Sequence, residues 1–182
     1  MLQPASSFLS PWSAYYATIG AASATLIGLM FIVITLSAGS RRIRRYPEGI
    51  GTFSTPTVVH FGAALLIAAV MLVPWRDLHH TAVLLAIAGA GGVAFALRVM
   101  MNTKRLNSSS YVPDTEDWVW YNVLPLIAYG AILVGALTIP LLAGKALIAV
   151  AAGTLFLVFI GIHNSWDVVT YIVIIDPDNE GE

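Results

Sequence analysis

Long uncharged stretches constrain the fold of this chain more than any other feature. No Asp, Glu, Lys or Arg occurs between Met1 and Ser40 or between Trp118 and Gly144. A helix crosses the ~30 Å hydrocarbon core of a bilayer with about 20 apolar residues, so each stretch is long enough to span a membrane. With 58% hydrophobic and 10% charged residues, the chain has too few polar side chains to cover a soluble fold. The sequence predicts an all-α integral membrane bundle.

Charge and cysteine content exclude several classes of function. Nine basic residues against ten acidic ones give a net charge of -1, so the chain lacks the basic bias of nucleic-acid-binding proteins. The absence of cysteine excludes disulfides, iron–sulfur ligation and thiol catalysis. We therefore expect the lipid bilayer, and no nucleic acid, to be a partner.

Turn-forming and charged residues divide the apolar sequence into about five predicted transmembrane helices. They cover about residues 12–38, 52–75, 81–101, 117–143 and 146–175, within a single domain of residues 1–182. The lead before them has no Lys or Arg and does not resemble a cleavable signal peptide. Pro125 and Pro140 are expected to bend the fourth helix.

A dense basic cluster follows the first predicted span and sets the expected orientation. It consists of Arg41, Arg42, Arg44 and Arg45. Lys and Arg concentrate in cytoplasmic loops, so the amino terminus is expected outside and the carboxyl terminus inside. Lys104 and Arg105 then also lie inside, while Arg76 and Lys145 lie outside. At a membrane surface the cluster should also attract anionic lipids, by about 1 kcal/mol per residue.

Polar residues interrupt the last predicted helix. At about 100° per residue, its polar arc spans roughly 120°. The arc contains His163, Asn164, Asp167, Thr170 and Tyr171. A charged or imidazole side chain is costly in lipid, so this arc should face other helices, water or a ligand.

Residues on four predicted helices share a similar depth. At 1.5 Å per residue from the inner helix ends, His60 and Asp167 lie about 10 Å deep and Arg98 and Asn122 about 5 Å deep. We therefore expect one inner-leaflet polar centre, in which Arg98 pairs with Asp167 because each is otherwise an isolated charge. The expected members are His60, Arg98, Asn122, His163, Asn164, Asp167 and Tyr171.

Several functions are compatible with such a centre. Its hydrogen bonds can simply hold the helices together, as in a structural or regulatory membrane subunit. It can instead serve an ion or proton channel or transporter, with His163 beside Asp167 as a pH-sensitive gate. A further alternative is haem or metal binding, for which His60, His163 and Asp167 are the candidate ligands.

Enzymatic activity is not expected from these residues. Ser165 projects about 160° away from Asp167 on a helix, which excludes a Ser-His-Asp arrangement within that helix. No phosphate-binding glycine loop occurs, because the glycines of residues 89–92 fall inside the third predicted helix and suggest a packing surface.

Small residues repeat every four positions in the first and third predicted helices. Such rows allow close helix approach and lead us to expect a homo-oligomer. The rows are Gly20, Ala24 and Gly28; Ala17, Ala21 and Thr25; and Ala88, Gly92 and Ala96.

Two segments carry a resemblance. Residues 21–31 read AASATLIGLMF and residues 163–167 read HNSWD. Through these segments the chain resembles uncharacterised small bacterial membrane proteins of about five helices. The resemblance implies a multi-pass protein in the plasma membrane of a prokaryote, and it implies no activity and no functional residues.

Overall fold

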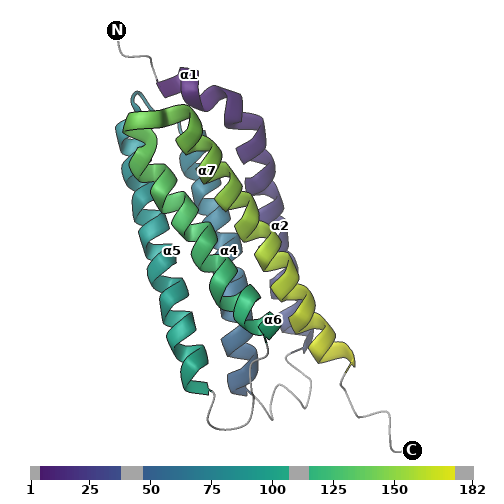
Figure 1. Ribbon diagram of the computed structural model, residues 1–182. Coiled ribbons are helices and arrows are strands. Elements are labelled where there is room, and N and C mark those ends of the chain that lie inside the picture. Colours follow the sequence, from purple (N-terminus) through teal and green to yellow (C-terminus); the bar gives the residue numbers. More distant parts are fainter. Residues whose placement is uncertain (1–4, 38–46, 107–114, 175–182) are drawn as a thin grey trace, which may run out of the picture.

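The computed structural model describes residues 5–37, 47–106 and 115–174, and its regular elements there are all helical (Figure 1). The chain begins with α1 (Ala5–Leu9), the 3-10 turn η1 (Ser10–Trp12) and α2 (Ser13–Ser37), followed by α4 (Pro47–Leu72) and α5 (Leu78–Leu106). A short helix α6 (Thr115–Trp118) continues through the π-helical turn η2 (Val119–Val123) into α7 (Leu124–Ile174). The predicted all-α class is confirmed.

Within the described residues, four helical stretches are long and apolar enough to cross a membrane. They are Ala5–Thr35, Thr55–Leu72, Leu78–Lys104 and Thr115–Asp167. The chain is therefore a multi-pass helical membrane protein by the length and composition of its helices.

The helix α7 folds back on itself near its middle. Leu142 has φ -142° and ψ 53°, outside the helical region, and joins two helices that we call the first arm (before Leu142) and the second arm (after it). Pro140, which lacks a backbone N–H and crowds the preceding turn, weakens the helix just before this point. In Figure 1 the green first arm and the yellow second arm run in opposite directions, joined at the top of the view.

Glycines bring the two arms of α7 into close contact. A Cβ added at Gly135 would lie 2.8 Å from the Val150 side chain, and one added at Gly153 would lie 2.8 Å from the carbonyl oxygen of Ala128. Real Cβ atoms do not approach other atoms so closely, so the absence of a side chain at both positions permits this packing.

Glycines also permit close contact between α7 and its neighbours α5 and α4. On α5, Gly89 lies against the backbone of Leu133, and Gly92 lies against the ring of Tyr129, both on the first arm. On the second arm, Gly161 receives the ring of a buried phenylalanine of α4. The glycines of residues 89–92 thus include two packing positions, as the sequence suggested.

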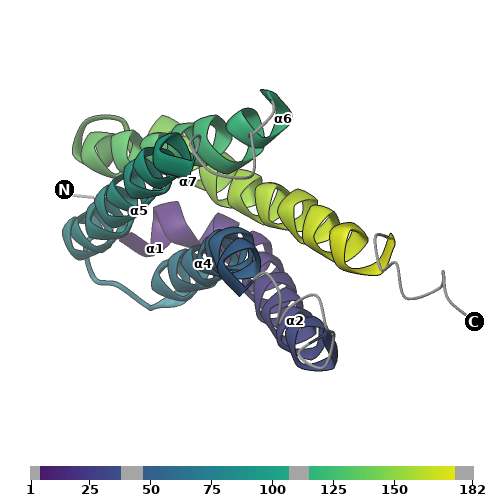
Figure 2. The same cartoon turned by 90° about the horizontal axis from the view of Figure 1, so that it is seen from below.

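The helix α4 is at the centre of the arrangement, in contact with α2, α5 and α7. Seen from below, it lies between α2 and α5 (Figure 2). The largest fully buried side chains are apolar or aromatic apart from one histidine, and they come from every long helix: Tyr16, His60, Phe61, Ile67, Leu85, Tyr129, Ile132, Ile139, Leu147, Val150, Leu157 and Ile160.

The π-helical turn η2 has an identifiable cause. Pro125 has no backbone N–H for a helical bond to residue 121, and its ring displaces that carbonyl. The chain responds with a wider turn, in which the N–H of Leu124 bonds to the carbonyl of Val119. Within this turn Tyr121 and Asn122 are both buried. The bend expected at this proline takes the form of the wider turn.

Helix bounds differ from those expected in several places. The lead contains α1, whose Ala5 and Leu9 are buried. The helix α4 begins at Pro47, where a proline suits the first turn of a helix, and it continues through Pro56. The helix α5 extends at both ends beyond residues 81–101.

Candidate functional site

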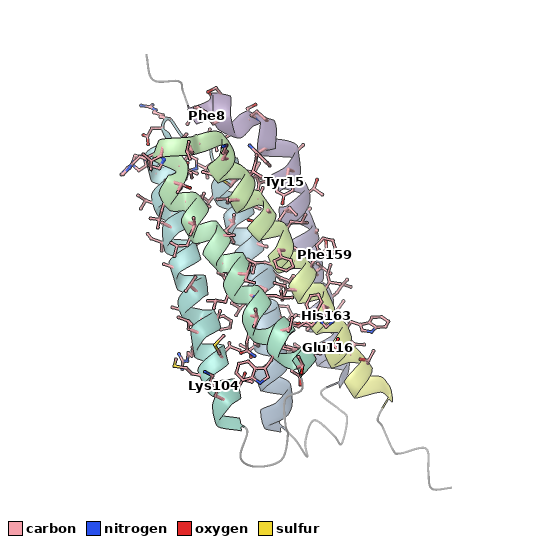
Figure 3. All side chains as sticks on the ribbon, viewed as in Figure 1. Phe8, Tyr15, Lys104, Glu116, Phe159 and His163 are labelled. Carbon is pink, nitrogen blue, oxygen red and sulfur yellow. The ribbon has the colours of Figure 1, made fainter. Side chains whose placement is uncertain are left out.

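His163 lies between two carboxylates at one end of the α7 hairpin. Its Nε2 is 3.5 Å from Oε1 of Glu116 on α6, and its Nδ1 is 3.3 Å from Oδ2 of Asp167, one turn further along the second arm. The three residues, which we call the histidine clamp, join the start of the first arm to the second arm. Figure 3 shows the labelled His163 and Glu116 close together at the lower end of the bundle.

The imidazole of His163 also stacks on an indole. The centroids of the His163 and Trp120 rings are 3.7 Å apart and their planes are 5° from parallel. Trp120 belongs to η2, so the stack is a second contact between the segment that leads into the first arm and the second arm. The buried Nδ1 makes no aligned hydrogen bond within the described residues, so its approach to Asp167 is electrostatic in character.

The histidine clamp is partly exposed at the surface of the bundle. The side chain of His163 is 25% exposed, that of Asp167 41% and that of Glu116 69%. Glu116 and Asp167 lie at the two ends of the apolar stretch Thr115–Asp167, so the clamp lies at the boundary of the membrane-spanning part. A protonated imidazole there carries a positive charge near both carboxylates, whereas a neutral imidazole carries none.

His60 forms a separate, buried contact. It is 1% exposed, and its Nδ1 lies 3.0 Å from the hydroxyl of Tyr129 on the first arm. Phe95 of α5 meets the imidazole edge-on, with ring centroids 6.3 Å apart. The ring of Tyr129 is fixed from the other side by Gly92, so His60 links α4 to the contact between α5 and α7.

Two asparagines are buried near the clamp. Oδ1 of Asn122 accepts a hydrogen bond of 3.4 Å from the hydroxyl of Thr103 on α5. The hydroxyl of Tyr121 donates to the backbone carbonyl of Asn164 at 3.4 Å. Both asparagine side chains are fully buried, which places amide groups where α5, η2 and the second arm meet.

Several buried polar atoms of the described residues make no hydrogen bond to other described groups. They include Nε2 of His60, Nδ2 of Asn122, both side-chain amide atoms of Asn164, and the hydroxyls of Tyr16, Ser23 and Thr81. Buried groups of this kind are normally satisfied by water or a ligand. No Asp, Glu, Lys or Arg is buried in the described part of the chain.

Arg98 does not join this interior. It is an exposed residue of α5, whereas Asp167 forms its ion pair with His163. Gly91, Ala94 and Asn102 on the same side of α5 are exposed as well. The structure therefore places Arg98 on the outer face of the bundle, away from the partner that the sequence suggested.

The remaining predicted members of the site lie outside what the structure describes. The side chain of Tyr171 is outside the described residues, as is the basic cluster of Arg41, Arg42, Arg44 and Arg45. His60 and His163 contact different residues, and the described part of the chain has no group of three or more His, Cys, Asp or Glu residues suited to a metal ion.

The small-residue rows have different surroundings. Gly92 and Ala96 are buried, so their row packs within the chain against α7. On α2, Gly20 packs against Ala68, while a Cβ at Gly28 would have nothing within 4 Å. The row of Ala17, Ala21 and Thr25 is exposed along its whole length.

Sequence reasoning gave Glu116 and Trp120 no place in the polar centre. Glu116 directly precedes the fourth predicted helix, and Trp120 carried no signal beyond its aromatic character. A helix-by-helix analysis does not reveal such contacts, because the hairpin brings together residues more than forty positions apart. A groove over the two arms is lined by apolar residues and adds no polar group.

Comparison of the chain with protein-family models, curated proteins and solved structures finds no match.

Proposed function

We propose that the chain is a pH-responsive membrane subunit, in which protonation of His163 controls how the ends of the two arms of α7 are held together. The observation that carries this proposal is the position of one imidazole between carboxylates of two different elements, Glu116 on α6 and Asp167 on the second arm. Histidine changes charge between about pH 5 and 8, so such a contact strengthens when a proton binds.

The surroundings of His163 support a switch more than a static contact. The clamp is partly exposed to water, so protons can reach it. The charged groups that face the imidazole in the described residues are both acidic, and Asp117 on α6 adds another carboxylate beside Glu116. Trp120 holds the imidazole by stacking, an arrangement that also favours a cation over an aromatic face.

A pair of spin labels tests this proposal directly. The chain has no cysteine, so cysteines introduced at Thr115 and Thr170 would be its only labelling sites. In lipid, the distribution of label distances should be narrow at pH 5 and broader at pH 8. His163→Gln should remove this pH dependence, whereas His79→Gln, a control at an exposed histidine in the α5 start, should not. The same pH dependence with and without His163 would refute the switch.

Proton conduction is a second candidate function, favoured by the buried polar atoms of His60, Asn122 and Asn164 that lack a described partner. Uncharged donors and acceptors of this type can order a chain of water molecules. Purified protein in liposomes with a pH gradient tests it. Conduction predicts a proton flux that falls with Asn164→Leu and His60→Leu, whereas the subunit proposal predicts no flux above that of protein-free liposomes.

We further propose five membrane crossings, with the amino terminus outside and the carboxyl terminus in the cytoplasm of a prokaryote. The opposite directions of the two arms of α7 support this number (Figure 1). Phe8 and Lys104 lie at opposite ends of the bundle, as this orientation requires (Figure 3). Single cysteines replacing Arg76 and Lys104 should react with an impermeant maleimide in intact cells at the first position only. Reaction at Lys104 instead would reverse the topology.

Association with a second copy is part of the proposal as well. The exposed row of Ala17, Ala21 and Thr25 supports it, because small residues allow a helix of another copy to approach closely. Ala21→Leu should lower the fraction of dimer or higher oligomer in nanodiscs. A single-copy mass for the unaltered protein in several mild detergents and in nanodiscs would contradict the association.

A further inference from the structure

Arg98 is a charged residue inside a candidate membrane span, and it is exposed at the surface of the bundle. The span covers Leu78–Lys104 of α5, so Arg98 lies six positions before its end. Among the residues that the structure describes, none forms an ion pair or hydrogen bond with its guanidinium. A guanidinium facing hydrocarbon without a partner is strongly unfavourable, so something outside the described chain must interact with it.

On α5, the exposed residues that lie next to Arg98 toward the middle of the span are small. At about 100° per residue, Ala94 and Gly91 lie within roughly 40° of Arg98 on the helix. Both are exposed, and a Cβ added at Gly91 would have nothing within 4 Å. The larger Leu97 and Met101, 43% and 55% exposed, lie to one side. Small residues therefore form a shallow strip that leads from the middle of the span to the guanidinium.

This strip is distinct from the packing face of α5. The contacts with α7 use Gly89 and Gly92, which meet Leu133 and Tyr129. Gly91 lies between these positions in sequence but has no neighbour in the bundle. No described residue packs against Gly91, and the face of α5 that carries Arg98 is exposed.

We propose that Arg98 binds the phosphate of an anionic phospholipid, whose acyl chain lies over Ala94 and Gly91. The distance along the helix from Arg98 to Lys104 is about 9 Å at 1.5 Å per residue, and a long arginine side chain extends toward the membrane surface. The guanidinium can therefore reach the phosphate layer. In Figure 3, the labelled Lys104 marks the end of α5 toward which it would extend.

The chemistry of the guanidinium selects a phosphate. Its planar set of N–H donors matches two phosphate oxygens at once, which a single ammonium group does not. The exposed amide of Asn102, one turn toward the membrane surface, offers another donor. A phosphatidylcholine carries a cation that compensates its own phosphate, whereas a phosphatidylglycerol does not, so the site should prefer phosphatidylglycerol.

Native mass spectrometry of the full-length protein tests this site. Delipidated protein in a mild detergent would be titrated with phosphatidylglycerol and with phosphatidylcholine. The unaltered protein should bind phosphatidylglycerol with about fivefold higher affinity than Arg98→Gln, equivalent to about 1 kcal/mol for one basic residue near an anionic surface. Arg98→Lys keeps the charge without the paired donors and should give an intermediate affinity.

A matched pair of substitutions tests the strip separately from the charge. Ala94→Leu fills the strip beside Arg98, and Ala24→Leu makes the same change at an exposed position of α2. Ala94→Leu should lower the affinity for phosphatidylglycerol, and Ala24→Leu should not. If Arg98→Gln fails to fold, this pair still decides the question, because equal affinities in the two alanine variants would overturn the proposal.

Three other results would also overturn it. The first is an unchanged preference for phosphatidylglycerol in a folded Arg98→Gln variant. The second is full displacement of the lipid by inorganic phosphate at equal concentration, which would identify a site for a free anion. The third is loss of association between copies in Arg98→Gln without any change in lipid binding, which would show that a protein carboxylate pairs with the guanidinium.

Discussion

The imidazole of His163 lies flat on the indole of Trp120, with ring centroids 3.7 Å apart and planes 5° from parallel. This stack fixes the plane of the imidazole, and the plane determines which carboxylates its two nitrogens can face. Nε2 lies 3.5 Å from Oε1 of Glu116, and Nδ1 lies 3.3 Å from Oδ2 of Asp167. The stack and the two ion pairs therefore belong to one arrangement, which holds the ends of the two arms of α7 together.

Removing either carboxylate of the clamp should lower the stability of the protein modestly, and more at acidic pH than at alkaline pH. Asp167→Asn and Glu116→Gln each remove one partner of the protonated imidazole, and partly exposed ion pairs contribute about 0 to 1 kcal/mol. We expect a loss in this range at pH 5 and a smaller one at pH 8, measured by unfolding in detergent. In a His163→Gln background, Glu116→Gln should have no additional effect. Equal losses at both pH values in that background would show that the carboxylates act through other residues.

Adjacent glycines of α5 should respond differently to alanine. A Cβ at Gly92 would overlap the ring of Tyr129, which is 1% exposed and held by His60, so Gly92→Ala should destabilise the protein by about 1 to 3 kcal/mol. A Cβ at Gly91 meets nothing within 4 Å, so Gly91→Ala should be neutral or slightly stabilising. Thermal unfolding of the two variants in the same detergent compares them. A loss of stability in Gly91→Ala as large as that in Gly92→Ala would contradict the packing of this face.

The contact between His60 and Tyr129 should be visible in a double-mutant cycle. Tyr129→Phe keeps the ring against Gly92 but removes the hydroxyl, leaving Nδ1 of the buried His60 unsatisfied, at a cost of about 1 to 3 kcal/mol. His60→Leu combined with Tyr129→Phe should restore part of this loss, because both partners are then apolar. Chemical unfolding of the single and double variants measures the coupling. Strictly additive losses would show that the hydroxyl and the imidazole do not interact.

The start of α5 should lose stability in acid because of Asp77. Its carboxylate accepts hydrogen bonds from the backbone N–H groups of His79, at 2.9 Å, and His80, at 3.3 Å, as an N-cap does. Desolvation raises the pKa of Asp77, but the hydrogen bonds from His80 and His79 and the nearby His80 ring outweigh it, so the pKa is lower than the ordinary value. The stabilisation is therefore complete above the unfolded pKa of about 4 and is lost as the pH falls through the folded value.

Amide exchange at His79 and His80 measures this effect. At neutral pH, these amide protons should exchange faster in Asp77→Ala than in the unaltered protein. The difference should shrink as the pH falls and the carboxylate of the unaltered protein is protonated. His80→Gln retains the capping carboxylate and should keep most of the protection. A difference between Asp77→Ala and the unaltered protein that is independent of pH would exclude a role for the charge.

The sequence by itself determined the class of the protein and the composition of its helices. Uncharged stretches longer than a bilayer is thick leave no other way to satisfy the backbone than helices, so the all-α membrane class follows from the residues alone. The spacing of His163 and Asp167 also brings them within reach on any helix, because residues four apart lie on one face. These conclusions need no knowledge of how the helices pack.

Tertiary structure decided which polar residues meet. The helices α2, α4 and α7 are apolar on nearly all sides, so their sequences contain no stripe that identifies the buried face. Depth can then be counted along each helix, but its rotation cannot. In the structure His60 on α4 points inward to Tyr129, Arg98 lies on an exposed face of α5, and the fold of α7 at Leu142 brings Glu116 to His163. Close packing at glycines fixes how the helices are rotated against one another, and it depends on the partner helix.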